Sequence, residues 1–92
     1  MNYVGYDSVG NKLQTGDICS FKLENESHER EGIIVYSEDY FAFCFDMNDN
    51  QFPSVLMSKV ELGTIKKIVN VWSTQATDEK YKWYQELFKG EM

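Results

Sequence analysis

Several residue types that build common functional sites are scarce in this sequence. Its 92 residues include two cysteines, one histidine and one proline. Cys19 and Cys44 each lie inside an apolar run, whereas a disulfide framework uses more cysteines, placed at the ends of loops. Together with His28 they could offer three zinc ligands, but no two of them have the short paired spacing of a zinc site. We therefore expect reduced, buried thiols, and neither a metal nor a cofactor.

Long hydrophobic runs and catalytic signatures are absent as well. No stretch approaches the roughly 18 consecutive apolar residues of a membrane helix, and the chain is polar by residue 7, which predicts neither a membrane span nor a secretory signal. Glycine-rich phosphate-binding patterns, C-x-x-C and H-E-x-x-H do not occur. We find no convergent acid, base and electrophile of the kind that an enzyme needs. We therefore predict a cytoplasmic protein with no catalytic residues and no enzymatic activity.

Positive charge is scarce in one part of the chain. The sequence has 15 acidic and 9 basic residues, and residues 24–50 hold eight of the acids with only Arg30 to balance them. Such a segment gains nothing from counterion release on a nucleic acid. It is either a solvated face that keeps the domain soluble or a face that binds a basic protein surface. The eight acids, which we take as candidate partner-binding residues, are Glu24, Glu26, Glu29, Glu31, Glu38, Asp39, Asp46 and Asp49.

Short β-type runs fill most of the remaining sequence. Residues 18–23 alternate, with Cys19, Phe21 and Leu23 on one face. Residues 32–36 are rich in β-branched side chains, and residues 40–45 are apolar on both faces, which predicts a central or doubly covered strand. Turn clusters separate the runs, at residues 7–11, 12–17, 37–39 and 46–50. The pattern predicts a mainly β fold, a small SH3-like barrel of five to six short antiparallel strands.

The last part of the chain changes to a helical period. Over residues 78–89, large side chains recur at steps of three and four, which predicts one amphipathic helix of about three turns. A helix this short needs a docking surface, and its own barrel is the simplest one. We therefore predict a single domain, with a β-barrel over residues 1–76 and a helical segment over 77–92 packed on it.

Two patterns would suit nucleic acids, but each has a simpler interpretation. An aromatic platform for base stacking needs a positive groove, and the aromatic run lies in the most acidic region, so we expect these rings in the core: Tyr40, Phe41, Phe43 and Phe45. Three lysines without arginine are typical of a solvated strand face: Lys59, Lys66 and Lys67. We do not expect direct nucleic-acid binding.

The run Asp7-x-x-Gly10-Asn11-Lys12-x-x-x-Gly16-Asp17-Ile18-x-x-Phe21 resembles the opening of the YopX-like phage and prophage proteins. Gly32-Ile33-Ile34-Val35-Tyr36 and Glu61-Leu62-Gly63-Thr64-Ile65 resemble later strands of that family, so the resemblance covers residues 5 to 65. The chain departs from the pattern at Lys66-Lys67 and in its aromatic helix. The resemblance implies a small barrel encoded by a phage or an integrated element, working in a bacterial host cell. It carries over no catalytic residue.

Two functional hypotheses follow from these patterns. The first is a non-enzymatic interaction module that binds a host or phage protein through the acidic residues and inhibits a nucleic-acid-handling enzyme. The alternative is a structural, self-assembling homodimer, in which the acidic residues serve solubility alone. Its docking surface would be the aromatic side of the helix: Tyr81, Trp83, Tyr84 and Phe88.

Overall fold

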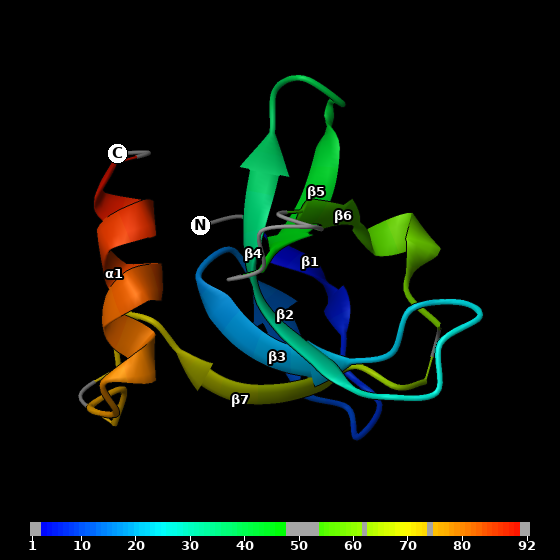
Figure 1. Cartoon of the computed structure of the whole chain (residues 1–92), viewed down its shortest axis with the longest axis horizontal. Helices are drawn as coiled ribbons and strands as arrows, with labels where there is room; N and C mark the ends of the chain where they lie inside the picture. Colours follow the sequence, from blue (N-terminus) through cyan, green and yellow to red (C-terminus); the bar gives the residue numbers. More distant parts are fainter. Residues whose placement is uncertain (1–2, 48–53, 62, 74, 91–92) are drawn as a thin grey trace.

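The computed structural model describes residues 3–47, 54–61, 63–73 and 75–90, with the side chains of residue 3 and of residues 88–90 left out. Within these ranges the chain forms seven β-strands, one short 3-10 helix and one α-helix (Figure 1). The elements are β1 (Tyr3–Tyr6), β2 (Lys12–Gln14), β3 (Asp17–Phe21), β4 (Arg30–Ser37), β5 (Ala42–Asp46), β6 (Ser54–Leu56), η1 (Met57–Lys59), β7 (Lys66–Asn70) and α1 (Lys80–Gly90). The predicted mainly β fold with a C-terminal helix is confirmed.

The strands form two antiparallel sheets and do not close into a barrel. Five strands pair in the order β6-β5-β4-β3-β7, and β1 pairs with β2 in a separate sheet. Lys12–Gln14, predicted as part of a turn, is the strand β2. The predicted closure into a barrel fails at the two edges of the five-stranded sheet. Strand β6 at one edge has only three residues, and the turn that begins at Asp7 occupies the outer side of β7 at the other edge. There the Ser8 amide donates to the Ile65 carbonyl at 2.7 Å and the Lys67 amide to Asp7 Oδ2 at 3.0 Å.

Both faces of the five-stranded sheet are buried. One face carries Ile18, Ile33 and Val35, which pack with the helix. The opposite face carries Cys19, Phe21, Ile34 and Phe45, which pack with residues of β1 and β2, and the rings of Phe21 and Phe45 stack at 4.2 Å. Consecutive residues therefore point into different cores, as strand alternation requires. This arrangement confirms the shared face of Cys19, Phe21 and Leu23.

Helix α1 packs on the first of these faces. It begins two residues later than predicted, and the Asp78 carboxylate accepts a hydrogen bond from the Lys80 amide at 3.1 Å. Tyr81 and Tyr84 are buried among the strand residues of that core. The helix therefore covers its own sheet, and its burial there explains how three turns remain stable.

Strand β7 contains a β-bulge. Ile18 pairs with Val69 and Cys19 with Lys67, so Ile68 is an extra residue without a partner on β3. The bulge follows Lys67 by one residue. It turns Ile68 outward, where its side chain is exposed, and returns Val69 to the core.

Candidate functional site

The turn between β4 and β5 presents aromatic side chains to solvent. Ser37 pairs with Ala42, so residues 38–41 form the turn and β5 starts two residues later than predicted. Tyr40 is 62% exposed and Phe41 is 82% exposed. The prediction that these two rings belong to the core is therefore wrong, because the strand alternation on which it rested begins only at Ala42.

Phe41 also has a strained backbone. Its φ is 51°, in the left-handed region that glycine and asparagine adopt most readily. For an L-residue this conformation costs about 1–2 kcal/mol. Because the side chain is almost fully exposed, its packing returns little of that cost. Backbone strain at an exposed aromatic residue is typical of functional positions.

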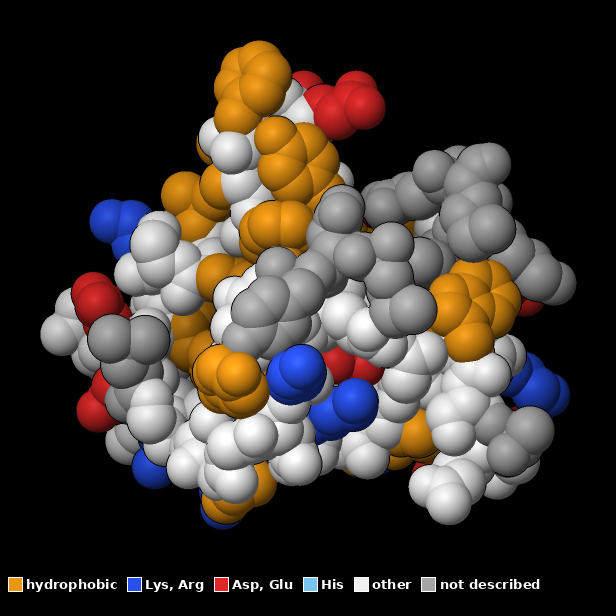
Figure 2. All heavy atoms as spheres, turned by 180° about the vertical axis from the view of Figure 1, so that it is seen from behind, with side chains coloured by type: hydrophobic (Ala, Val, Ile, Leu, Met, Phe, Trp, Pro, Cys, Tyr) orange, Lys and Arg blue, Asp and Glu red, His pale blue; other side chains and the backbone are white. Residues whose placement is uncertain are grey.

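Acidic side chains flank these rings. Tyr36, at the end of β4, is also exposed and meets Phe43 edge to face at 5.3 Å. We define the hairpin tip as Tyr36, Glu38, Asp39, Tyr40 and Phe41. Figure 2 shows hydrophobic side chains gathered at the top of the molecule, over the turn between β4 and β5, with acidic side chains beside them. The hairpin tip therefore combines apolar area with negative charge.

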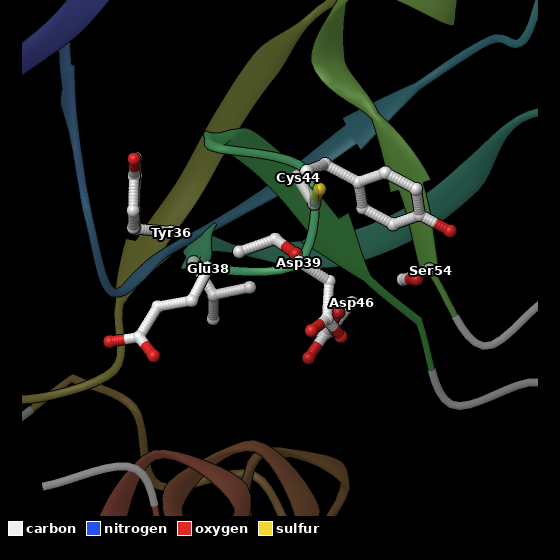
Figure 3. A pocket seen from close by; sticks show the side chains of 9 residues that line it. Tyr36, Glu38, Asp39, Cys44, Asp46 and Ser54 are labelled. Carbon is white, nitrogen blue, oxygen red and sulfur yellow. The ribbon is translucent and has the colours of Figure 1, made fainter.

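A pocket of about 360 Å³ lies beside the hairpin tip (Figure 3). It is lined by the ends of β4 and β5, the turn between them and the first residue of β6, and we call it the tip pocket. Its carboxylates are Glu38, Asp39 and Asp46, and Ser54 faces Asp46 across the β5–β6 pair. No hydrogen bond or ion pair from the described residues reaches these three carboxylates.

Burial controls the chemistry of the pocket floor. Asp46 is partly buried, and desolvation raises the pKa of its carboxyl group. Desolvation also raises the pKa of the neighbouring Cys44 thiol, and the Asp46 charge adds to this effect. Burial, chiefly, raises the pKa of Cys19 to about 12. Both cysteines are free and buried, as predicted, and neither thiol has the thiolate character of a nucleophile.

The acids of residues 24–31, which span the loop before β4 and its first two residues, lie elsewhere, and two of them are neutralised within the chain. Glu26 accepts two hydrogen bonds from the Arg30 guanidinium, at 2.7 and 2.9 Å. Glu31 forms an ion pair with the Lys80 ammonium at 3.4 Å and accepts a hydrogen bond from the Tyr84 hydroxyl at 3.4 Å. This ion pair raises the pKa of Lys80. Of the four acids in this group, only Glu24 and Glu29 are exposed.

The eight predicted acids therefore do not form one face. Strand β4 has eight residues, which at a normal strand rise is roughly 25 Å between the loop before it and the turn after it. The acids of residues 24–31 lie at one end of this strand, and Glu38 and Asp39 lie at the other. Asp46 on β5 pairs with Ile33, in the middle of β4. Asp49 lies outside the described residues. These acids are close together in the sequence, which suggested a single cluster. The sequence alone does not show that an extended strand separates them in space.

The predicted dimerisation surface on the helix is largely used by the protein's own core. Tyr81 is buried and Tyr84 is only 3% exposed. Trp83 is partly buried and packs on the same cluster. The Phe88 side chain lies outside the described residues. Tyr81 and Tyr84 are therefore not available as a docking surface for a second copy.

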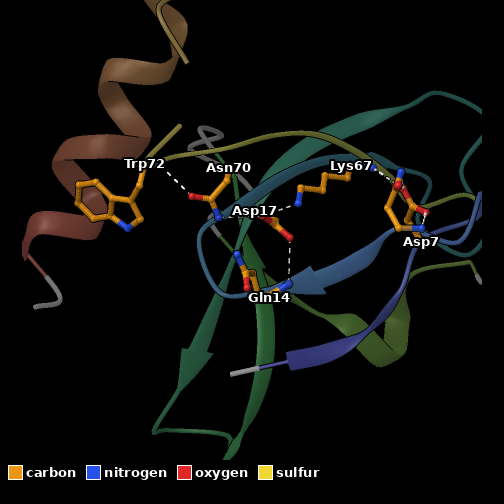
Figure 4. Close-up of polar contacts among 7 residues, drawn as sticks. Asp7, Gln14, Asp17, Lys67, Asn70 and Trp72 are labelled. Carbon is orange, nitrogen blue, oxygen red and sulfur yellow. Dashed lines mark hydrogen bonds and ion pairs between the residues drawn. The ribbon is translucent and has the colours of Figure 1, made fainter. Parts of the chain in front are cut away.

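The predicted basic cluster is divided in a similar way. Asp17 is fully buried and accepts hydrogen bonds from the Gln14 amide at 2.9 Å and from Asn70 Nδ2 at 2.8 Å (Figure 4). The Lys67 ammonium lies 3.5 Å from the same carboxylate. Lys67 thus belongs to a structural network, whereas Lys59 and Lys66 are exposed.

Other kinds of site find no support in the described part of the chain. It contains no group of three or more histidine, cysteine or acidic side chains arranged to hold a metal ion. No helix in these ranges has the length and apolar character needed to cross a membrane. Comparisons with known protein families, curated proteins and solved structures gave no match. The resemblance to the YopX-like proteins stays a prediction.

Proposed function

We propose that this chain is a non-enzymatic interaction module that binds a basic protein surface through the hairpin tip. The observation that carries the proposal is Phe41, an exposed aromatic residue held in a strained conformation beside carboxylates that no described side chain neutralises. Neither feature is useful to the fold. Both are useful to an interface, in which aromatic anchors supply most of the binding energy.

The composition of the hairpin tip indicates the character of the partner. Tyr40 and Phe41 expose apolar surface to water, and burying that surface against another protein contributes favourable binding free energy. Glu38 and Asp39 beside them attract positive charge and raise the rate of association with a basic surface. The partner is therefore expected to have an apolar depression rimmed by lysine or arginine.

The resemblance to YopX-like proteins supports a phage or prophage origin, and hence a host or phage protein as the partner. Mimicry of nucleic acid requires a continuous row of negative charge, like that of a phosphate backbone. The described acids lie before β4, after β4 and, for Asp46, opposite the middle of β4, and Glu26 and Glu31 are neutralised within the chain. The proposal is accordingly one of protein recognition through the hairpin tip.

The test is affinity capture from a bacterial lysate with the tagged full chain, followed by binding measurements with the purified candidate. Tyr40→Ser combined with Phe41→Ser should abolish binding. The matched control is Val9→Ser, which removes an apolar side chain that is 71% exposed in a different turn. Equal binding by wild type and the double variant would refute the proposal.

A second pair of variants tests the charge. Glu38→Lys with Asp39→Lys should weaken binding at least tenfold and remove its dependence on salt. The matched control reverses the same number of exposed charges in the loop, Glu24→Lys with Glu29→Lys, and should bind nearly as well as wild type. If the loop variant alone loses binding, the contact surface is the loop.

A further inference from the structure

The end of the β4–β5 hairpin extends beyond the strands that flank it in the sheet (Figure 1). On one side, β3 begins at Asp17, and the Gly16 amide just before it donates to the Ile34 carbonyl at 2.9 Å. On the other side, β6 ends at Leu56, which pairs with Cys44. The last part of the hairpin therefore consists of two paired strands, and no third strand from the described ranges lies beside it.

Tyr36 presents its backbone groups to the open side of β4. Along an antiparallel strand the backbone N–H and C=O groups of successive residues point to alternate sides, and the Ile34 carbonyl points toward β3. Tyr36, two residues later, faces the same side, beyond the end of β3. It lies opposite Phe43 on β5, in a pair that exchanges no backbone hydrogen bond. Within the described part of the chain, no group accepts from the Tyr36 amide or donates to its carbonyl.

The chain covers the outer edge of β7 but leaves this edge of β4 open. The turn that begins at Asp7 lies along β7, where the Ser8 amide donates to the Ile65 carbonyl and the Lys67 amide to the Asp7 carboxylate. Exposed strand edges are otherwise protected by lysine, proline or a bulge. Residues 35–37 contain neither lysine nor proline, and they pair with β5 without a register shift. This edge therefore has the features that an added strand requires.

We propose that the partner protein adds an extended, basic segment to the outer edge of β4 at Tyr36, beyond the end of β3. This assignment rests on the proposed function and specifies the part of the partner that meets the hairpin tip. One residue of the added strand exchanges two backbone hydrogen bonds with Tyr36, as in an antiparallel pair. The residues that follow it reach the turn, where Glu38 and Asp39 favour lysine or arginine.

Amide hydrogen exchange on the free full chain tests whether this edge is open. The Tyr36 amide should exchange about tenfold faster than the amides of Val35 and Cys44, which pair with each other across the hairpin. A Tyr36 amide that is protected as strongly as these two would overturn the assignment.

Two capped hexapeptides of equal charge then test binding without the partner. One alternates lysine with valine, which favours a strand, and the other alternates lysine with proline, which has no amide to donate. The valine peptide should slow exchange of the Tyr36 amide, and the proline peptide should bind about fivefold more weakly. Equal binding would mean that charge alone attracts the peptides and would overturn the assignment. A Tyr36 amide that exchanges equally fast with and without the valine peptide would do the same.

Variants of Tyr36 separate the edge from the proposed function. Tyr36→Pro removes the amide, whereas the matched control Tyr36→Thr removes the ring and keeps the amide. Proline is tolerated where an edge amide points outward, and circular dichroism checks the fold. The proline variant should bind the valine peptide about fivefold more weakly than the threonine variant, and equal binding would refute the edge contact. If the proline variant unfolds, the exchange measurements on the wild-type chain decide.

The two proposals can fail separately. Partner binding that is lost in the Tyr40 and Phe41 double variant but unchanged in Tyr36→Pro would leave the proposed function in place and refute the added strand. Binding that both variants retain would refute both proposals.

Discussion

Phe41 shows how a single residue can work against the stability of its own fold. The turn after β4 requires a left-handed residue at this position, and glycine or asparagine would satisfy it at a lower cost. A large aromatic side chain that is exposed there gives the folded monomer little in return. Residues that lower stability at an exposed position are often retained for function.

Phe41→Asn is therefore expected to stabilise the protein and to remove its binding activity. Relief of the backbone strain should contribute about 1 kcal/mol, which raises the melting temperature by roughly 5 °C in a domain of this size. Thermal unfolding followed by circular dichroism gives the first quantity, and binding of the captured partner gives the second. A lower melting temperature would show that the Phe41 ring supports the fold.

Asp7 has the opposite role and stabilises the turn that covers the edge of β7. Burial alone would raise its pKa, but amide donors of Lys67, Asn11 and Val9 and the Asn11 side chain outweigh burial, and the pKa falls from 3.8 to about 2. The folded state thus favours the charged form. Its stabilising effect is complete above pH 4 and is lost as the pH falls from 3.8 through 2.

Asp7→Asn should lower the free energy of unfolding at neutral pH by roughly 2 kcal/mol, since hydrogen bonds to a charged acceptor are lost. Urea unfolding at pH 7, 4 and 2.5 measures the effect. The difference between wild type and variant should shrink as the pH falls, because wild-type Asp7 then becomes protonated as well. A difference that does not change with pH would show that the Asp7 charge is unimportant.

At the scale of whole elements, helix α1 and strand β4 stabilise each other. Tyr84 packs with strand residues of the first core, and its hydroxyl donates to Glu31 on β4. Lys80 on the helix pairs with the same glutamate, but this pair is more exposed. Packing therefore contributes most of the docking energy, and an exposed pair of this kind is worth less than about 1 kcal/mol.

Two variants of Tyr84 separate packing from polar contact. Tyr84→Ala should lower the free energy of unfolding by roughly 3–4 kcal/mol, since it leaves a cavity in the core. Tyr84→Phe removes only a long hydrogen bond and should cost less than about 1 kcal/mol. Chemical denaturation measures both, with the exposed Lys82→Ala as the control. Equal losses in the two tyrosine variants would contradict this division.

At the scale of the whole molecule, both faces of the five-stranded sheet are covered within one chain. The helix covers one face, and β1 and β2 cover the other. The exposed aromatic side chains at the turn between β4 and β5 are concentrated at one end of a hairpin. The fold therefore needs no second copy to cover its sheet, and under the proposed function the hairpin tip is the surface that meets another protein.

The purified chain should therefore be a monomer of 10.8 kDa. Light scattering coupled to gel filtration measures the mass over a range of concentrations. A stable dimer would contradict the expectation and favour the self-assembly hypothesis. In that case the Tyr40 and Phe41 double variant would show whether the hairpin tip forms the contact.

The fold class and much of the core could be predicted because they depend on local periodicity. Alternation in residues 18–23 placed Cys19 and Phe21 on one face, and steps of three and four after residue 78 placed Tyr81 and Tyr84 on one side of a helix. These patterns work over a few residues and require no knowledge of the partner element. Strand ends and sheet closure were predicted less well, because they depend on which backbone groups find partners across the molecule.

Residue chemistry and spacing alone were enough to establish a mainly β domain with a C-terminal helix, two buried thiols and an excess of acidic side chains. Only the three-dimensional arrangement determined what those acids can do. Strand β4 separates Glu26 and Glu31 from Glu38 and Asp39, and ion pairs with Arg30 and Lys80 neutralise the first two. The physical reason is that charge acts through distance in space, and an extended strand places sequence neighbours far apart.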